Sequence, residues 1–193
     1  MNFHRIVLYK LNLYKTINKP FYIKDTYESI IPLDIYQHWH TKVLPPKMNE
    51  NVEILKKQNP NFNHYLYDDN DCREFIKQNF HEDVLDAYDS LIPLAYKADL
   101  WRLCILFIKG GIYIDIKFKC RNGFNFIALT ENEYFVRDRN PNGVSNGLII
   151  SKPKNTILLN VINKIVENVR LKYYGNDSLE ITGPNILGKF FTR

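Results

Sequence analysis

The chain has 193 residues, of which 45% are apolar and 14% aromatic, so it is long enough for one ordinary domain with a substantial core. This composition excludes a wholly disordered or fibrous chain, and a content of three cysteines excludes a disulfide scaffold. The net charge of +5 favours anionic partners such as phosphates, and no apolar run approaches the roughly 20 residues needed to cross a bilayer.

The first part of the chain gives the weakest structural signal. Residues 1–28 are predicted to be an N-terminal extension of undecided structure, in which Ile6–Leu13 fits either a strand or an interfacial helix. Charged side chains interrupt its apolar residues, so we expect neither a signal peptide nor a membrane anchor.

From residue 29 onward, strand and helix patterns alternate. β-Branched and aromatic residues predict strands at Ile31–Trp39, His64–Tyr67, Ile112–Asp115, Tyr134–Val136 and Leu148–Ile150. Apolar residues at helical spacing predict helices at Lys47–Gln58, Cys72–Phe80, Leu91–Lys109, Ile157–Val169 and Pro184–Phe191. This alternation predicts an α/β fold with parallel strand pairs.

The helix predicted over Leu91–Lys109 carries two unexpected charges. It is apolar nearly all round, which is typical of a buried helix, and Gly110-Gly111 is expected to end it. Asp99 and Arg102 lie three residues apart on one of its faces. Because a buried charge is costly unless it is paired or used, these residues form either a structural ion pair or part of a binding site.

Asp115 is the second candidate functional residue. It stands at the carboxyl end of the predicted strand Ile112–Asp115, the edge at which α/β sheets bind ligands. Carboxylates there commonly hold hard cations that neutralise phosphates. The alternative is an aspartate that only terminates a strand.

These residues belong to a larger pattern. The segment ADLWRLCILFIKGGIYIDIK, residues 98–117, contains D-x-x-R, an apolar helix and G-G-x-Y-x-D in this order. It resembles the glycosyltransferases with a DxD sugar-binding motif, which include fungal initiating mannosyltransferases and sphingolipid mannosyltransferases. The segments IPLDIYQHWH, NPNFNHYLYDD, SNGLIISKPKN and ITGP resemble the same family in the same order, so the resemblance covers about residues 30–188.

The resemblance implies a GT-A-like, Rossmann-like fold whose mixed, mostly parallel sheet is flanked by helices. It implies a catalytic domain over residues 29–193, shortened at its C-terminus, since family members continue beyond this point. The implied reaction moves a hexose, with mannose as one candidate, from a nucleotide-diphosphate sugar to a glycan, glycolipid or glycoprotein acceptor, with retention of configuration.

The resemblance also assigns catalytic roles. Asp115 is expected to reach a metal ion and through it the diphosphate. Asp99 is expected to accept hydrogen bonds from hydroxyls of the donor sugar. Arg102 is expected to orient that sugar or to contact phosphate, since its planar fork matches oxyanions.

Four further residues are expected to bind the donor. Trp39 would stack on the nucleotide base, with a core tryptophan as the alternative. Asn146 would contact the sugar or the acceptor, with a turn residue as the alternative. Tyr113 and Lys117 flank Asp115 and complete the predicted donor-binding set.

Lys117 departs from the family pattern, because it replaces the second acid of DxD. A charged lysine cannot ligate a metal ion. Either Asp115 with another group holds Mn²⁺ or Mg²⁺ more weakly, or the Lys117 ammonium replaces part of the charge of the ion at the diphosphate. A third alternative is an inactive family member that acts as a binding subunit.

Two other interpretations start from different residues. The basic composition allows a nucleic-acid-binding module, although the lysines and arginines form no stripe and no known RNA- or DNA-binding signature is present. His38 and His40 have the spacing of a zinc pair on one side of a strand, but no matching pair follows. For location we expect a cytoplasmic protein or one peripheral to membranes, and a Golgi-like site follows from the resemblance alone.

Overall fold

The computed structural model describes residues 7–10, 13–16, 24–120, 124–140 and 142–191. One sheet of seven strands runs through the molecule, in the order β2-β1-β6-β7-β5-β3-β4. Its strands are β1 (Val7–Lys10), β2 (Leu13–Thr16), β3 (Asp34–His38), β4 (Asn63–Tyr67), β5 (Gly111–Ile114), β6 (Tyr134–Arg137) and β7 (Val144–Ser151). The helices are α1 (Pro46–Gln58), α2 (Asp69–Asn79), α3 (Glu82–Ser90), α4 (Leu94–Lys109), the 3₁₀ turn η1 (Phe126–Leu129), α5 (Thr156–Arg170) and α6 (Pro184–Gly188).

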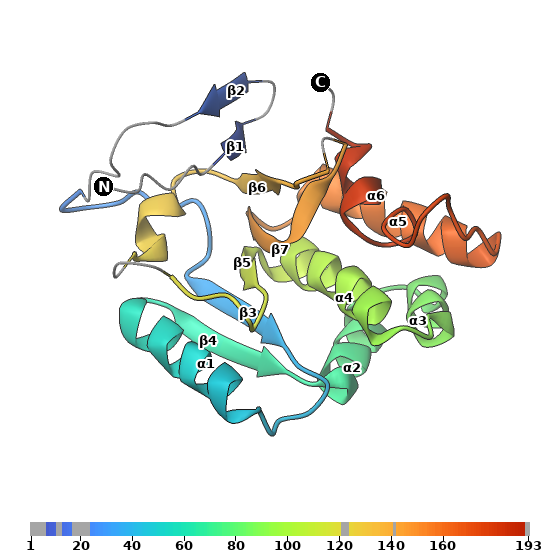
Figure 1. The fold of residues 1–193 in the computed structure, drawn as a ribbon, viewed down its shortest axis with the longest axis horizontal. Coiled ribbons are helices and arrows are strands. Elements are labelled where there is room, and N and C mark those ends of the chain that lie inside the picture. Colours follow the sequence, from blue (N-terminus) through green and yellow to red (C-terminus); the bar gives the residue numbers. More distant parts are fainter. Residues whose placement is uncertain (1–6, 11–12, 17–23, 121–123, 141, 192–193) are drawn as a thin grey trace.

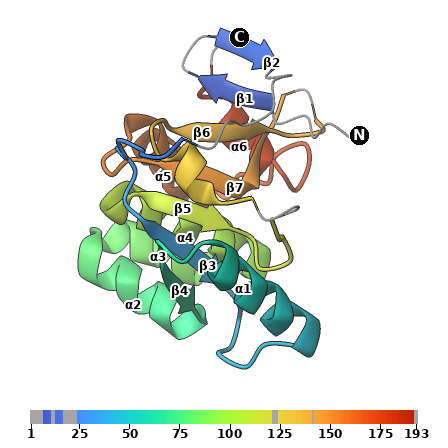
Figure 2. The ribbon, with the colours of Figure 1, turned by 90° about the vertical axis from the view of Figure 1, so that its left-hand side faces the viewer.

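The sheet has a hydrophobic core on each face. Figures 1 and 2 show α1 and η1 on one side of it and α2, α3 and α4 on the other. Neighbouring residues of a strand point to opposite faces, so Ile112 packs in the core beneath α1, whereas Tyr113 packs in the core beneath α4. Both faces are covered, which explains why all four residues of β5 are buried.

The mixed α/β sheet confirms the predicted fold class, but the sheet is less parallel than we expected. Strand β3 pairs in parallel with both β4 and β5, whereas the other four described pairings are antiparallel. The parallel pairs occur where helices connect the strands, α1 between β3 and β4 and the group α2 to α4 between β4 and β5. The described residues of the connections around β6 and β7 contain no such crossover helix, and these strands join antiparallel.

The N-terminal strands belong to the same sheet. Strand β1 pairs antiparallel with β2 and with β6, so the part of Ile6–Leu13 that the structure describes is a strand and not a helix. Residues 6, 11 and 12 lie outside the described residues. The division into residues 1–28 and 29–193 stays a prediction.

The helix predicted over Leu91–Lys109 begins later than expected, at Leu94, because Pro93 precedes it. A further helix, α3, covers residues 82–90, where we predicted no element. Gly110 ends α4 with φ of 68°, and a Cβ there would lie 2.6 Å from the Pro153 Cδ, so both the backbone and the space favour glycine.

Helix α2 also begins earlier than its predicted first residue, Cys72. The Asp71 backbone N–H donates to Asp68 Oδ1 over 2.9 Å, and the Asp68 N–H donates to Asp71 Oδ2 over 3.1 Å. This reciprocal capping box satisfies two free donors, so the acidic residues expected to start the helix do so from Asp69 onward.

Cys104 on α4 is a fully buried member of the core. Within the described ranges, no helix is both long enough and apolar enough to span a bilayer.

Candidate active site

Helix α4 and strand β5 bring the predicted charged residues together. Asp99 and Arg102 project from α4, the chain reverses at Gly110, and β5 returns to place Asp115 directly after its last residue. Strand β5 lies between β3 and β7, so the polar groups at its carboxyl end meet near the middle of the sheet.

Arg102 is at the centre of this group and is only 7% exposed. Its Nε donates to the Ala98 carbonyl over 3.0 Å, and its Nη1 donates to the Asn146 carbonyl over 2.6 Å. Its Cζ lies 4.4 Å from the ring centre of Tyr113, a cation–π contact. The guanidinium plane is therefore fixed from three directions.

Two carboxylates share the same guanidinium. Asp99 Oδ1 lies 3.3 Å from Arg102 Nη2, and Asp115 Oδ1 lies 3.3 Å from Arg102 Nη1. The ion pair predicted within the helix is therefore present, but Arg102 also reaches the end of β5. The structural interpretation and the binding-site interpretation of these residues are compatible.

Asp99 is almost fully enclosed by donors. Its Oδ1 accepts from the Asn146 amide over 3.2 Å, and its Oδ2 accepts from the Thr182 hydroxyl over 3.0 Å. Burial raises the pKa of Asp99 above its ordinary value, while the Arg102 charge and these two hydrogen bonds act in the opposite direction.

Asn146 is not the turn residue of the alternative interpretation. Strand β7 begins at Val144, four residues before the predicted Leu148, and Asn146 is a buried residue inside it. Its amide nitrogen donates to Asp99 and to the Thr182 carbonyl, the latter over 3.3 Å, whereas its Oδ1 is buried without a hydrogen-bond partner.

Asp115 is the carboxylate of this group that opens to solvent. The Tyr113 hydroxyl donates to its Oδ1 over 2.9 Å, and the Lys117 ammonium lies 3.5 Å from its Oδ2. Its side chain is 21% exposed, and that of Lys117 is 65% exposed. We call Asp99, Arg102, Tyr113, Asp115, Asn146 and Thr182 the cleft cluster.

The cleft cluster borders a hollow of about 340 Å³, the central cleft. The cleft is lined by His38, Trp39, His40, Met48, Leu94, Ala95, Ala98, Arg102, Tyr113, Asp115, Ile116 and Lys117. Of the predicted donor-binding residues, Trp39, Tyr113 and Lys117 therefore line it together with Arg102 and Asp115. Asp99 and Asn146 do not line the cleft. They contact the Arg102 guanidinium, Asp99 through its carboxylate and Asn146 through its backbone carbonyl.

Sequence reasoning missed several residues of this region. Thr182 lies in the ITGP segment, which we noted only as a match, and its hydroxyl donates to Asp99. Met48, Leu94 and Ala95 add apolar walls to the central cleft. They have no sequence signal of their own, because apolar residues on a helix also predict an ordinary core.

The two histidines of the weaker zinc hypothesis make different contacts. His38 Nε2 lies 2.8 Å from Asp69 Oδ1, and burial lowers the pKa of His38 despite this carboxylate. The exposed His40 ring lies 4.7 Å from the Trp39 ring. Among the described residues, no three histidine, cysteine or acidic side chains converge as a metal-binding group.

The side chains around Asp115 also do not fit a divalent ion held by paired carboxylates. Asp115 Oδ1 already accepts from Tyr113 and Arg102, so Oδ2 is the oxygen left for a ligand. The nearest charged group to Oδ2 is the Lys117 ammonium, which has only donors and cannot ligate. The donor set therefore lacks a second protein oxygen at the position where DxD would supply one.

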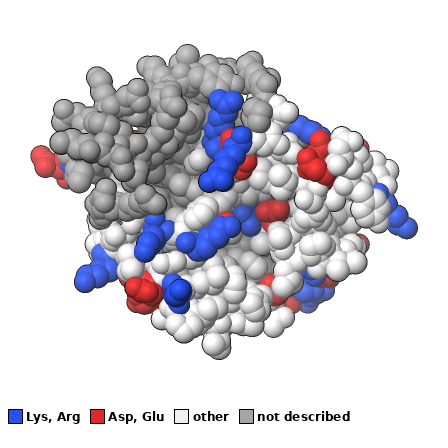
Figure 3. Space-filling view, in the orientation of Figure 1, with Lys and Arg blue, Asp and Glu red and all other residues white. Residues whose placement is uncertain are grey.

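The charge distribution on this side of the molecule is predominantly basic. Figure 3 shows Lys and Arg side chains across the middle of the face seen in Figure 1, with a few acidic side chains among them. Such a face attracts anions by its field.

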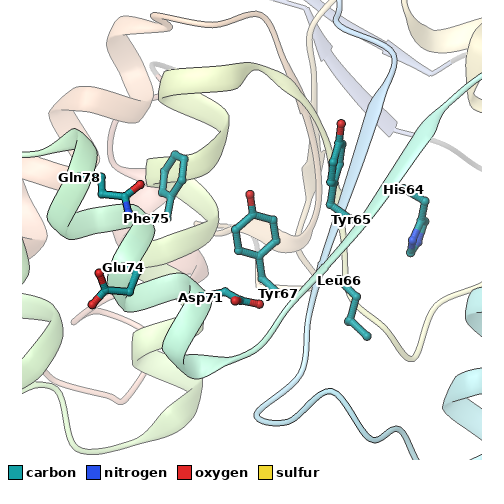
Figure 4. Close-up of a pocket in the computed structure, with 8 residues that line it drawn as sticks. All are labelled: His64, Tyr65, Leu66, Tyr67, Asp71, Glu74, Phe75 and Gln78. Atoms are coloured by element: carbon teal, nitrogen blue, oxygen red, sulfur yellow. The ribbon is translucent and has the colours of Figure 1, made fainter.

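A second hollow, of about 450 Å³, lies beside the edge strand β4. Figure 4 shows its wall of Tyr65 and Tyr67 from β4 facing Glu74, Phe75 and Gln78 of α2. It shares no lining residue with the central cleft and contains no group of converging charges comparable to the cleft cluster.

Comparisons with known proteins agree with the fold and the motif. Residues 45–135 match the family described as the glycosyltransferase sugar-binding region containing a DXD motif. An uncharacterized glycosyltransferase of Acanthamoeba polyphaga mimivirus is 31% identical over 79% of this chain and 60% of its own length. Inositol phosphoceramide mannosyltransferase 3 of Schizosaccharomyces pombe is 30% identical over 70% of this chain and 37% of its own length.

The chain thus spans about 60% and 37% of these two relatives. Among solved structures, the PaToxG glycosyltransferase has a TM-score of 0.64 at 20% identity and covers 83% of this chain and 67% of its own. This likeness shows that the mixed α/β sheet has the GT-A-like fold of a glycosyltransferase. Residues 45–135, which contain the motif on α4 and β5, are thus similar to the glycosyltransferase sugar-binding regions that contain a DXD motif.

Proposed function

We propose that the protein transfers a hexose from a nucleotide-diphosphate sugar to an acceptor hydroxyl. The observation that carries this proposal is the arrangement of Arg102, Asp115 and Lys117 at the central cleft, directly after a central strand of the sheet. Two cationic side chains border a space that is open to solvent, and α/β folds bind nucleotides at this edge. Mannose is the candidate sugar because the fungal relatives are named mannosyltransferases.

Each residue then has a separate task. Trp39 stacks on the nucleotide base at the cleft wall, since its ring lines the cleft together with His40. Arg102 presents fixed N–H groups toward the diphosphate, and its immobility means that little reorganisation is needed when charge develops. Asp99 and Asn146 keep Arg102 in place, and because Asp99 does not line the central cleft, the sugar contact that the resemblance predicts for it stays a prediction.

In the transfer step, the bond between the anomeric carbon and the phosphate oxygen breaks, and its electron pair leaves with the diphosphate. The acceptor oxygen bonds to the anomeric carbon, and the acceptor proton passes to the departing phosphate oxygen. Attack on the face of the leaving group gives retention without a covalent enzyme intermediate. Among the residues lining the cleft, Asp115 is the one carboxylate, and Tyr113 and Arg102 already occupy its Oδ1.

The resemblance predicts Mn²⁺ or Mg²⁺ on Asp115, since DXD-motif glycosyltransferases typically use a divalent ion. An ion bound there would supply positive charge to the leaving diphosphate. No step above depends on it, because the residues around Asp115 Oδ2 do not form a paired-carboxylate site.

For the acceptor, we propose a hydroxyl of a glycan, a glycolipid or a glycoprotein. The names of the fungal relatives favour an inositol-containing glycolipid among these. A lipid acceptor would place the protein at a membrane surface or at a Golgi-like site.

The test measures thermal stability with UDP-glucose, UDP-N-acetylglucosamine, GDP-mannose and UDP-galactose, each with and without Mn²⁺. A donor at about 100 times its Kd should stabilise the fold by about 2.7 kcal/mol. Asp115→Asn should lower a donor shift that needs Mn²⁺, because Asp115 Oδ2 is the oxygen left for the ion, and should leave a shift without Mn²⁺ in place.

Other outcomes would redirect the assignment. A donor-induced shift without any turnover would indicate an inactive binding subunit. Absence of a shift with all four donors, combined with salt-sensitive retention on nucleic acid, would contradict the transferase and favour the nucleic-acid-binding module.

A further inference from the structure

Lys117 stands at the position where the family pattern has the second acid of DxD. It follows Asp115 by two residues, lines the central cleft, and its ammonium lies 3.5 Å from Asp115 Oδ2. The same ammonium lies 5.5 Å from the centre of the Phe118 ring. The charge is therefore held beside the carboxylate, while its exposed end can turn toward a ligand in the cleft.

The formal charges show what this replacement does. With an acid at position 117, the carboxylates of positions 99, 115 and 117 would outweigh the single charge of Arg102 by two, which is the charge of one divalent ion. With Lys117, two carboxylates face two cations and the group is neutral. Replacing an acid, with a charge of −1, by a lysine, with a charge of +1, changes the net charge of the group by +2. This change equals the charge of one divalent ion.

The surroundings of Asp115 also disfavour an added cation. Its Oδ1 accepts from the Tyr113 hydroxyl and from Arg102. Its Oδ2 lies 3.2 Å from the position that a Cβ on Gly147 would occupy, so β7 closes one side of it. An ion bound to Oδ2 would lie next to the Lys117 ammonium, and like charges at that separation repel.

We propose that the Lys117 ammonium replaces the divalent ion as the mobile positive charge on the diphosphate of the donor. This inference rests on the proposed sugar transfer and names the group that neutralises its leaving group. Lys117 leaves Asp115 when the donor enters and donates hydrogen bonds to the diphosphate oxygens, and it keeps all three of its protons. The electron pair of the broken glycosyl–phosphate bond stays on the diphosphate, opposite the ammonium.

The experiment compares donor affinity with and without metal. GDP-mannose and UDP-glucose are titrated calorimetrically into the full chain, in excess EDTA and in excess Mn²⁺. The variants are Lys117→Met, which removes the charge, and Lys117→Asp, which restores the acidic pair. Lys119→Met is the matched control, since Lys119 is an exposed lysine nearby that does not line the central cleft.

We expect the parent chain to bind one donor with the same affinity in EDTA and in Mn²⁺, within about threefold. Lys117→Met should bind it at least about tenfold more weakly in both conditions, because a charge-assisted hydrogen bond is lost. Lys117→Asp should bind weakly in EDTA and recover at least about tenfold in Mn²⁺. Lys119→Met should match the parent.

Two results would overturn the proposal, and they differ from each other. If the parent binds only in Mn²⁺ and Lys117→Met behaves as the parent does, the ion is retained and Lys117 has no role. If the parent binds neither these two donors nor UDP-N-acetylglucosamine and UDP-galactose in either condition, the proposed transferase function fails together with this inference. Thermal unfolding of each variant without donor checks that the fold is intact.

Discussion

Strand β7 has a cluster of polar residues at each end, and the two clusters are organised differently. At its start, Asn146 belongs to the cleft cluster. At its end, Ser151 belongs to the Glu133 cluster, which we define as Glu133, Ser151, Lys152 and Asn155. Glu133 Oε1 accepts from the Ser151 hydroxyl over 2.9 Å, from the Lys152 backbone over 3.2 Å and from the Asn155 amide over 2.7 Å.

The Glu133 cluster is closed. Asn155 also caps α5 by accepting from the Ile157 backbone over 2.8 Å, so the cluster fixes the turn between β7 and α5. The cleft cluster instead places two carboxylates on one guanidinium, leaves the Asn146 Oδ1 unpartnered and opens to the central cleft through Asp115. The difference separates polar groups that hold a turn from polar groups that are kept available for a ligand.

The largest effect is expected from removing the charge at the centre of the cleft cluster. Arg102→Met leaves the Asp99 and Asp115 carboxylates without their shared cation, so the free energy of unfolding should fall by about 3–5 kcal/mol. Chemical denaturation measures this loss. Arg73→Met is the control, because Arg73 pairs with Asp89 at the surface and its loss should change little. If Arg102→Met and Arg73→Met lowered the free energy of unfolding equally, the buried ion pairs of Arg102 would contribute no more to stability than a surface ion pair.

Substitution in the Glu133 cluster should lower the stability of the fold without changing the binding of a nucleotide sugar. Glu133→Ala removes the acceptor of three donors, which should lower the free energy of unfolding by about 1–3 kcal/mol. The shift in melting temperature on adding a nucleotide sugar should remain that of the parent. A lost donor shift would contradict the assignment of Glu133 as a purely structural residue. The exposed Glu50→Ala in α1 is the matched control.

Acid sensitivity should come from outside both clusters, since neither contains a histidine. Burial on β4 lowers the pKa of His64 to about 4 from its ordinary 6.5, and His64 Nε2 lies 2.8 Å from Gln37 Oε1. Between these two pH values the unfolded chain binds a proton that the folded chain does not, so stability is lost as the pH falls.

The loss through His64 should reach about 1–2 kcal/mol at pH 5. His64→Gln should remove this part of the loss between pH 6.5 and pH 5, as measured by denaturation at each pH, while the lowered pKa of His38 leaves a further part in place. The exposed His81→Gln should leave the profile unchanged. An unchanged profile in His64→Gln would assign the acid sensitivity to another group.

The smallest effect is expected at the wall of the central cleft. Trp39→Ala should weaken binding of the nucleotide about five- to tenfold, because an aromatic stacking surface for the base is lost. Trp39 is half-buried at the cleft wall, so the free energy of unfolding should fall less than on truncation of a fully buried tryptophan such as Trp101. Calorimetric titration with GDP and UDP, alongside Trp39→Phe as the conservative variant, measures this contribution.

The local part of the site was predictable from the sequence. Asp99 and Arg102 three residues apart must share a face of a helix, and Gly110-Gly111 must end that helix before Asp115. These relations depend on backbone geometry over a few residues, and the structure confirms them. The same holds for the acidic start of α2, although its first turn begins earlier than predicted.

The rest of the site depends on contacts between distant residues. Asn146 and Thr182 reach Asp99 across 47 and 83 positions of the chain, and only the packing of β7 and the segment before α6 against α4 brings them there. The antiparallel pairing of β5 with β7 likewise joins distant residues, such as Ile114 and Leu148, and no local pattern encodes it. The sequence by itself thus determined which residues carry charge on α4 and β5. The tertiary structure alone decided which of their oxygens and nitrogens are already occupied, because hydrogen bonds between distant segments form only when the whole sheet is assembled.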